Sequence, residues 1–170
     1  MQETTAQYMA RITGYVAGKN HMAVLQETSS TLAGLVKQST AGKLTQRPAL
    51  DKWSIAEILA HLAESEIVFG YRLRLVLGAS GTQIQAFDQN VWHDNASYIN
   101  NDAQGALKLF ESIRASNIAL LKSLSKAQWD NYGMHQERGK ETVARIVEMF
   151  AGHDINHTIQ VERILNGTRK

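Results

Sequence analysis

Two histidines spaced four residues apart near the end of the sequence suggest metal chemistry. His153 and His157 fall in a helical pattern, so their side chains project from one side of a helix at neighbouring turns. They also lie on the apolar stripe of that helix, and two imidazoles in this position can bind one divalent ion. The pattern leaves open a pair of hydrogen-bonded core histidines, because six histidines in 170 residues give this spacing by chance in about one chain in five.

The same segment reads H-D-x-x-H, one residue type away from the H-E-x-x-H motif of zinc proteases. In that motif the glutamate is the general base. Asp154 is one methylene shorter and reaches a metal-bound water less well. Only 13 residues follow His157, too few for a distant third ligand. The sequence therefore disfavours a zinc protease.

A third ligand has to come from another helix, and His61 is the best candidate. It lies beside Leu62 at the edge of an apolar stripe, where the alternative is a histidine hydrogen-bonded to a neighbour. Because the chain has no cysteine, any metal site must use histidines and carboxylates. The remaining histidines fall at expected helix ends or in loops, where surface or packing roles are expected: His21, His93 and His135.

The elements that position these histidines are predicted to be long helices. The chain has 1 proline, where average usage would give about eight. Apolar residues recur with helical period in five segments, at about 5–16, 21–39, 54–77, 102–124 and 140–165. Ser54 and Glu57 form a capping box at the start of the third segment. No segment alternates with the period of a strand.

The connections between these segments complete the predicted architecture. The segment 42–52 with Pro48 reads as a loop, 82–101 as a long crossing connection with room for one helical turn, and 125–139 as irregular. We therefore expect an all-α fold in one domain spanning residues 1–170. It is a four-helix bundle with a short extra N-terminal helix and a long connection between the second and third bundle helices.

Charge and hydropathy exclude several classes of partner. The chain has 18 Lys+Arg and 16 Asp+Glu, and no basic stripe with interleaved aromatics, which disfavours binding of nucleic acid. The first residues lack the basic and apolar regions of a signal peptide. No apolar run reaches 18 residues, so no membrane span is expected. A cytoplasmic protein is the default expectation.

Two blocks of the sequence resemble the signature of the DinB-like (YfiT-like) superfamily. The segment 53–66 reads WSIAEILAHLAESE, similar to W-S-x-x-E-x-x-x-H-L-A-x-x-E. The segments 139–143 and 153–164 read GKETV and HDINHTIQVERI, similar to G-x-x-T-V and H-D-x-x-H-x-x-Q-I-x-x-I. The resemblance covers about residues 5–166. His21 departs from it, because relatives often carry proline there.

The resemblance implies a four-helix bundle in which three histidines bind one divalent metal ion, commonly zinc, nickel or iron. Carried over to this sequence, the ligands are His61, His153 and His157. It also implies a small-molecule substrate, in some relatives a low-molecular-weight thiol such as bacillithiol or mycothiol, and a homodimer. Relatives include thiol-dependent S-transferases and isomerases as well as proteins named only as metal-dependent hydrolases.

Three neutral imidazoles leave an open position on the metal, which is the pattern of catalytic sites. A water or a substrate thiol bound there is more easily deprotonated. Gln160, Glu57 and Glu64 are spaced to contact a histidine and fix its tautomer, although a helix cap and a solvated surface are the alternatives for the two glutamates. No residue is identified as a catalytic base. A metal-dependent S-transferase or hydrolase is therefore predicted, and the alternative is a non-catalytic metal-binding or stress-response bundle.

Overall fold

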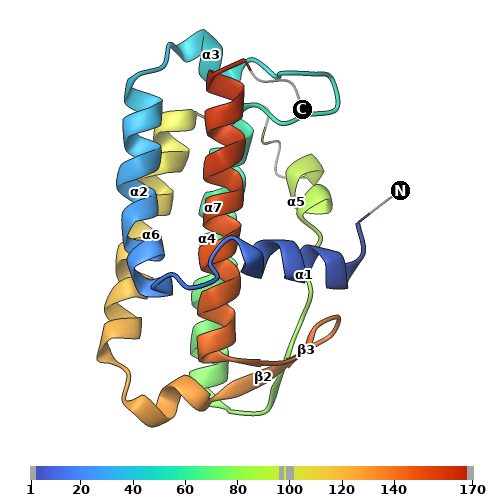
Figure 1. The fold of residues 1–170 in the computed structure, drawn as a ribbon, viewed down its shortest axis with the longest axis vertical. Coiled ribbons are helices and arrows are strands. Elements are labelled where there is room, and N and C mark those ends of the chain that lie inside the picture. Colours follow the sequence, from blue (N-terminus) through green and yellow to red (C-terminus); the bar gives the residue numbers. More distant parts are fainter. Residues whose placement is uncertain (1–2, 96–97, 99–101, 168–170) are drawn as a thin grey trace.

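Four long helices form the body of the molecule (Figure 1). The computed structural model describes residues 3–95, 98 and 102–167. The helices are α2 (His21–Lys37), α4 (Ile55–Gly78), α6 (Ala103–Ser123) and α7 (Val143–Leu165). The shorter α1 (Thr5–Gly14) crosses α7 at a steep angle, and α3 (Ala41–Thr45) lies at one end of the bundle. The expected all-α four-helix bundle with an extra N-terminal helix is confirmed.

The order of the helices around the bundle explains the long connection. Helix α2 packs against α6 and α7, and α4 packs against the same two helices, so α2 and α4 lie diagonally opposite each other. Helices α4 and α6 run in the same direction (Figure 1). The 24 residues of α4 span about 36 Å. The chain must travel that distance back before α6 begins, and residues 79–102 make the return.

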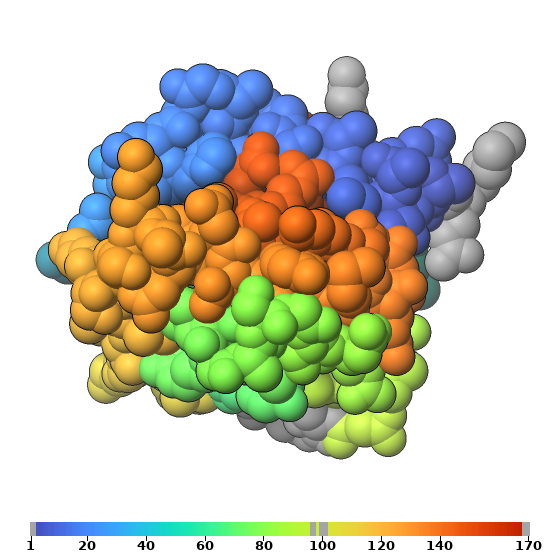
Figure 2. Space-filling model, turned by 90° about the horizontal axis from the view of Figure 1, so that it is seen from below, coloured from blue at the N-terminus to red at the C-terminus, as the bar shows by residue number. Residues whose placement is uncertain are grey.

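A small sheet that the sequence did not predict closes one end of the bundle. Strand β1 (Thr82–Ile84) pairs in parallel with β2 (Tyr132–His135), which pairs antiparallel with β3 (Gly139–Thr142). Viewed from that end, the segments around β1 and around β2 and β3 lie side by side (Figure 2). Strands of three and four residues are too short to show a period-2 pattern above the background of the sequence.

The predicted start of the last helix at residue 140 was wrong. Residues 140–142 belong to β3, and α7 begins at Val143 because the Thr142 side chain accepts a hydrogen bond from the Arg145 amide. The Ser54–Glu57 capping box at α4 is present. The segments read as loop or irregular also contain α3, α5 (Gln89–Asn95) and the short 3₁₀ helix η2 (Lys126–Asp130).

The buried surface of α4 is far wider than one apolar stripe. Two apolar clusters fill the bundle, one around Phe69 and Phe150 and the other around Leu59 and Phe110, and α4 contributes to both. Its buried polar side chains are Glu57, His61, Ser65, Glu66 and Arg72, and the N-cap residue Ser54 is buried as well. Among the described residues, none of the helices combines the length and the apolar character that crossing a membrane requires.

Gly152 allows α1 to approach α7 closely, and an alanine there is predicted to destabilise the fold. A Cβ added at Gly152 would lie 2.2 Å from the backbone oxygen of Ile12. Because a backbone atom cannot move away as a flexible side chain can, we expect Gly152→Ala to lower the free energy of unfolding by about 1–3 kcal/mol. Gly34→Ala in α2 is the matched control, since nothing lies within 4 Å of its added Cβ.

The control is expected to stabilise the protein by about 0.5–1 kcal/mol, because alanine is the better helix former. Urea unfolding of both variants measures the contrast. Equal stability of the Gly152→Ala variant and the unmodified protein would show that α1 does not pack on α7 at this point.

Candidate metal centre

Three histidines from two helices meet inside the bundle. The Nε2 atoms of His61 on α4 and His153 on α7 are 3.0 Å apart. The ring centroid of His157 lies 4.8 Å from that of His61 and 4.4 Å from that of His153. One ligand atom from each of the three residues falls within 4.8 Å of the others. The structure thus brings together the three residues that the sequence selected.

The three imidazoles are neutral at physiological pH. Burial lowers the pKa of His61 and His153 well below the ordinary value, and repulsion by the neighbouring histidines adds to the effect. Burial lowers the pKa of His157 to about 4, against the hydrogen bond with Gln160. A neutral imidazole keeps a nitrogen lone pair for a metal ion, so this environment favours the form that can bind a metal.

The hydrogen bonds around the rings show which nitrogens are free. His157 Nδ1 lies 3.0 Å from Gln160 Oε1; since the amide oxygen can only accept, Nδ1 carries the proton and Nε2 remains available. The Nδ1 atoms of His61 and His153 are buried without a hydrogen-bond partner among the described residues. The Nε2 atoms of His61 and His153 face each other at 3.0 Å, and together with His157 they form a donor set that suits a divalent ion.

A cavity of about 290 Å³ reaches the histidines from the side of β2 and α1. His61 and His153 line it together with Ser65, whose Oγ is 3.4 Å from His61 Nε2. Tyr8 and Arg72 also line it. His61 and His153 therefore border the cavity, while His157 lies outside its lining and is 7% exposed.

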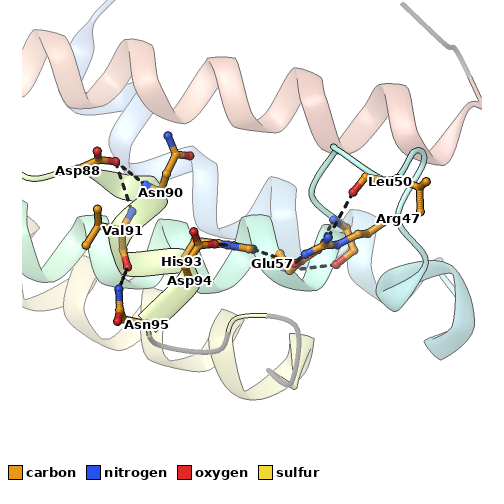
Figure 3. A network of polar contacts seen from close by, with 10 residues as sticks. Arg47, Leu50, Glu57, Asp88, Asn90, Val91, His93, Asp94 and Asn95 are labelled. Atoms are coloured by element: carbon orange, nitrogen blue, oxygen red, sulfur yellow. Dashed lines mark hydrogen bonds and ion pairs between the residues drawn. The ribbon is translucent and has the colours of Figure 1, made fainter.

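Two of the residues proposed to fix the histidine tautomers contact other groups. Glu57 caps α4 and is held between Arg47 and His93 (Figure 3). Its Oε1 lies 2.9 Å from His93 Nε2. Glu64 accepts a hydrogen bond from the Tyr98 hydroxyl. Of the three candidates, only Gln160 has a hydrogen bond to one of the three histidines.

The buried ion cluster beside the histidines was not predicted from the sequence. Arg114 on α6 donates to Asp154 Oδ2 at 2.6 Å and to Glu66 Oε2 at 2.7 Å. All three side chains are at most 3% exposed. Asp154 therefore faces Arg114, which argues against the role of the glutamate in a zinc-protease motif. The sequence did not indicate the cluster, because Arg114 lies outside the apolar pattern that predicted a helix over 102–124.

The fold and the three-histidine group together define the class of protein. The family model of the DinB superfamily matches residues 25–161, and the chain belongs to this superfamily.

YfiT of Bacillus subtilis is 23% identical over 143 residues, which cover 83% of this chain and 80% of YfiT, and it carries the name "Putative metal-dependent hydrolase". Its solved structure matches with a TM-score of 0.79 at 19% identity, over 97% of this chain and 89% of that chain, which establishes the shared four-helix bundle. An Oceanobacillus iheyensis protein, "Putative metal-dependent hydrolase OB0413", is 28% identical over 114 residues. The match covers 67% of this chain and 65% of that relative, just under two-thirds of its length.

Removal of the Gln160 side-chain amide is predicted to weaken metal binding without abolishing it. Gln160→Leu leaves the Nδ1–H of His157 without its acceptor, so the ring is no longer held in the tautomer that presents Nε2. We expect the metal dissociation constant to rise about 10–100-fold in competition titrations with a chelator. Gln160→Glu keeps an acceptor and is expected to retain the affinity. If both variants lose affinity equally, the hydrogen bond does not act in this way.

His93 is predicted to make the attachment of α5 depend on pH. Burial opposes its charge, but hydrogen bonds with Asp94 and Glu57 outweigh burial and raise its pKa. Since the folded pKa lies above the ordinary value of 6.5, the stabilisation is complete below about pH 6.5 and is lost as the pH rises through the folded pKa. Burial opposes the charge of Glu57, but hydrogen bonds with Arg47, Ser54 and His93 outweigh burial and lower the pKa of Glu57 to about 2, so Glu57 stays ionised in this range.

Urea unfolding of the unmodified protein and His93→Gln at pH 6 and pH 9 tests this dependence. The variant is expected to be less stable by about 1 kcal/mol at pH 6, with a smaller difference at pH 9. A difference that stays constant with pH would show that protonated His93 does not stabilise the contact.

Proposed function

We propose that this protein is a metal-dependent enzyme in which His61, His153 and His157 bind one divalent ion at the end of a substrate cavity. The observation that carries the proposal is the cavity of about 290 Å³, which contains His61 and His153 in its lining. A purely structural metal site would have no need of such access. The relatives named as metal-dependent hydrolases support the same class of activity.

A divalent ion held by three neutral ligands lowers the pKa of a water or a thiol bound to it, and thereby supplies a nucleophile at neutral pH. The residues of the chain contribute position and environment. His61 and His153 face the cavity, and Gln160 orients His157 from behind. Ser65 Oγ, next to His61, is placed to hydrogen-bond the attacking group. Since the chain has no cysteine, a thiol nucleophile must come from a second substrate.

Zinc, nickel and iron are all suited to three imidazole ligands. We propose zinc for the first reconstitution, because it is redox-inactive and is commonly bound by three protein ligands, with a water or substrate in the fourth position. Hydrolysis and thiol transfer share the activation of a nucleophile, and they differ in whether a thiol is consumed.

Two model reactions test the proposal and separate these alternatives. Zinc-loaded and metal-free protein are assayed for hydrolysis of p-nitrophenyl acetate and for transfer of 2-mercaptoethanol to monochlorobimane. We expect at least one reaction to require zinc and to be lost in His61→Ala but not in His21→Ala. If zinc-loaded protein is no faster than metal-free protein in both reactions, the bundle binds metal without this catalysis.

A further inference from the structure

The cavity contains an arginine whose charge is not matched by a carboxylate. Arg72 on α4 is 4% exposed. Its Nη2 donates to the backbone oxygen of Gln85 at 3.0 Å and lies 3.2 Å from His135 Nε2. Among the described residues no carboxylate lies within ion-pair distance of it. Within the described part of the chain the hydrogen bonds of Arg72 involve Nη2, and its Cζ lies 5.8 Å from the centre of the Phe87 ring, so Nε and Nη1 remain available to a molecule in the cavity.

The other charged groups of the cavity are either paired or at its rim. Arg138 forms two hydrogen bonds with Glu141, at 2.7 and 2.9 Å, and Glu3 forms two with Arg11. Glu137 is exposed to solvent, so water screens its charge.

The imidazole of His135, which lies beside Arg72, does not offset the charge of the arginine. Burial, with the charges of Arg138 and Arg72, lowers the pKa of His135 to about 4, so it is neutral. Burial also lowers the pKa of Arg72 to about 10, and the side chain therefore keeps its charge at neutral pH.

We propose that Arg72 binds a carboxylate group of the substrate, while the reacting end of the same molecule lies at the three histidines. Taking a guanidinium out of water without a counter-charge is costly, and a ligand carboxylate would offset that cost. An unpaired Arg72 suits a group of one negative charge better than a phosphate dianion. The cavity volume suits a small molecule. This inference deepens the proposed function, on which it rests, by naming the substrate as a small carboxylic acid.

Matched pairs of ligands test the proposal directly. Zinc-loaded protein is titrated calorimetrically with 3-mercaptopropionate and 4-mercaptobutyrate, and with the carboxamide of each, which differs mainly in charge. We expect the carboxylate to bind about 10-fold more tightly than its amide for at least one chain length. In Arg72→Gln that preference should fall below about twofold, while the affinity for the amide stays the same.

Two further variants test whether the loss of preference for the carboxylate is specific to the positive charge at position 72. Arg72→Lys keeps the positive charge and is expected to retain part of the preference. Arg145→Gln removes a cation that pairs with Glu148 outside the cavity, and it should behave as the unmodified protein. Circular dichroism checks that each variant is folded. A preference that survives in Arg72→Gln, or its absence in the unmodified protein, overturns the proposal.

An experiment on metal-free protein tests the carboxylate site independently of metal binding. Butyrate, added to metal-free protein, is expected to shift the Nε–H NMR resonance of Arg72, and butyramide is not. If the protein fails to bind zinc or thiols but shows this shift, the proposed function fails and the carboxylate site stands. If butyrate causes no shift that butyramide does not also cause, the carboxylate site is overturned whatever the metal does.

Discussion

His61→Ala and His157→Ala are each expected to abolish stable metal binding. Each change removes one of three ligands, and two imidazoles on flexible side chains leave the ion mostly solvated. We expect the metal dissociation constant to rise by on the order of 100-fold or more. After dialysis, metal content measured by plasma mass spectrometry should fall from near one ion per chain to a small fraction.

The thermal stability of these variants should lose its dependence on metal. A ligand present at 1,000 times its dissociation constant stabilises a fold by about 4 kcal/mol. For a chain of this size a chelator should therefore lower the Tm of the unmodified protein by roughly 10 °C. His21→Ala is the matched control, because His21 lies at the start of α2 and outside the three-histidine group. A chelator shift that persists in His157→Ala would place the metal elsewhere.

The second large effect is expected from Arg114→Met, which should lower the free energy of unfolding by about 3–5 kcal/mol. The change leaves Glu66 and Asp154 buried without their shared cation. The backbone oxygen of Leu25 also loses its donor at 2.7 Å. Arg145→Met is the control: the Arg145–Glu148 pair is about 30% exposed, and its loss should cost less than about 1 kcal/mol.

A combined variant separates buried charge from lost packing. Arg114→Met with Glu66→Leu and Asp154→Leu removes all three charges, so much of the lost stability should return. Urea unfolding measures each step. If the triple variant is as unstable as Arg114→Met alone, the cost comes from packing around α6 and not from unpaired carboxylates.

The parts of the fold that sequence could predict are those specified by local signals. Helical periodicity and the Ser54–Glu57 capping box place α4 within one residue of its observed ends. His153 and His157 share a helix face because of their spacing alone. His61 was selected from its place at the edge of an apolar stripe and from the resemblance of residues 53–66 to the DinB-like signature.

Long-range pairing explains what the sequence could not predict. The Arg114 cluster joins residues 40 and 48 positions apart, and nothing near Arg114 in the chain marks it as buried. Strand β3 is formed through its pairing with β2, so residues 140–142 looked like the start of the helix that follows. The sequence does not mark Arg72 as buried, and its contacts with Gln85 and His135 beside the small sheet place it in the cavity.

The metal centre is tested most directly by a crystal structure of zinc-loaded protein with diffraction data collected at the zinc absorption edge. We predict one anomalous peak bonded to the Nε2 atoms of His61, His153 and His157, at about 2.0–2.1 Å from each. The remaining coordination position should face the cavity that contains Arg72 and hold a solvent molecule. No peak between the three histidines, or a fourth protein ligand that closes the site, would contradict this prediction.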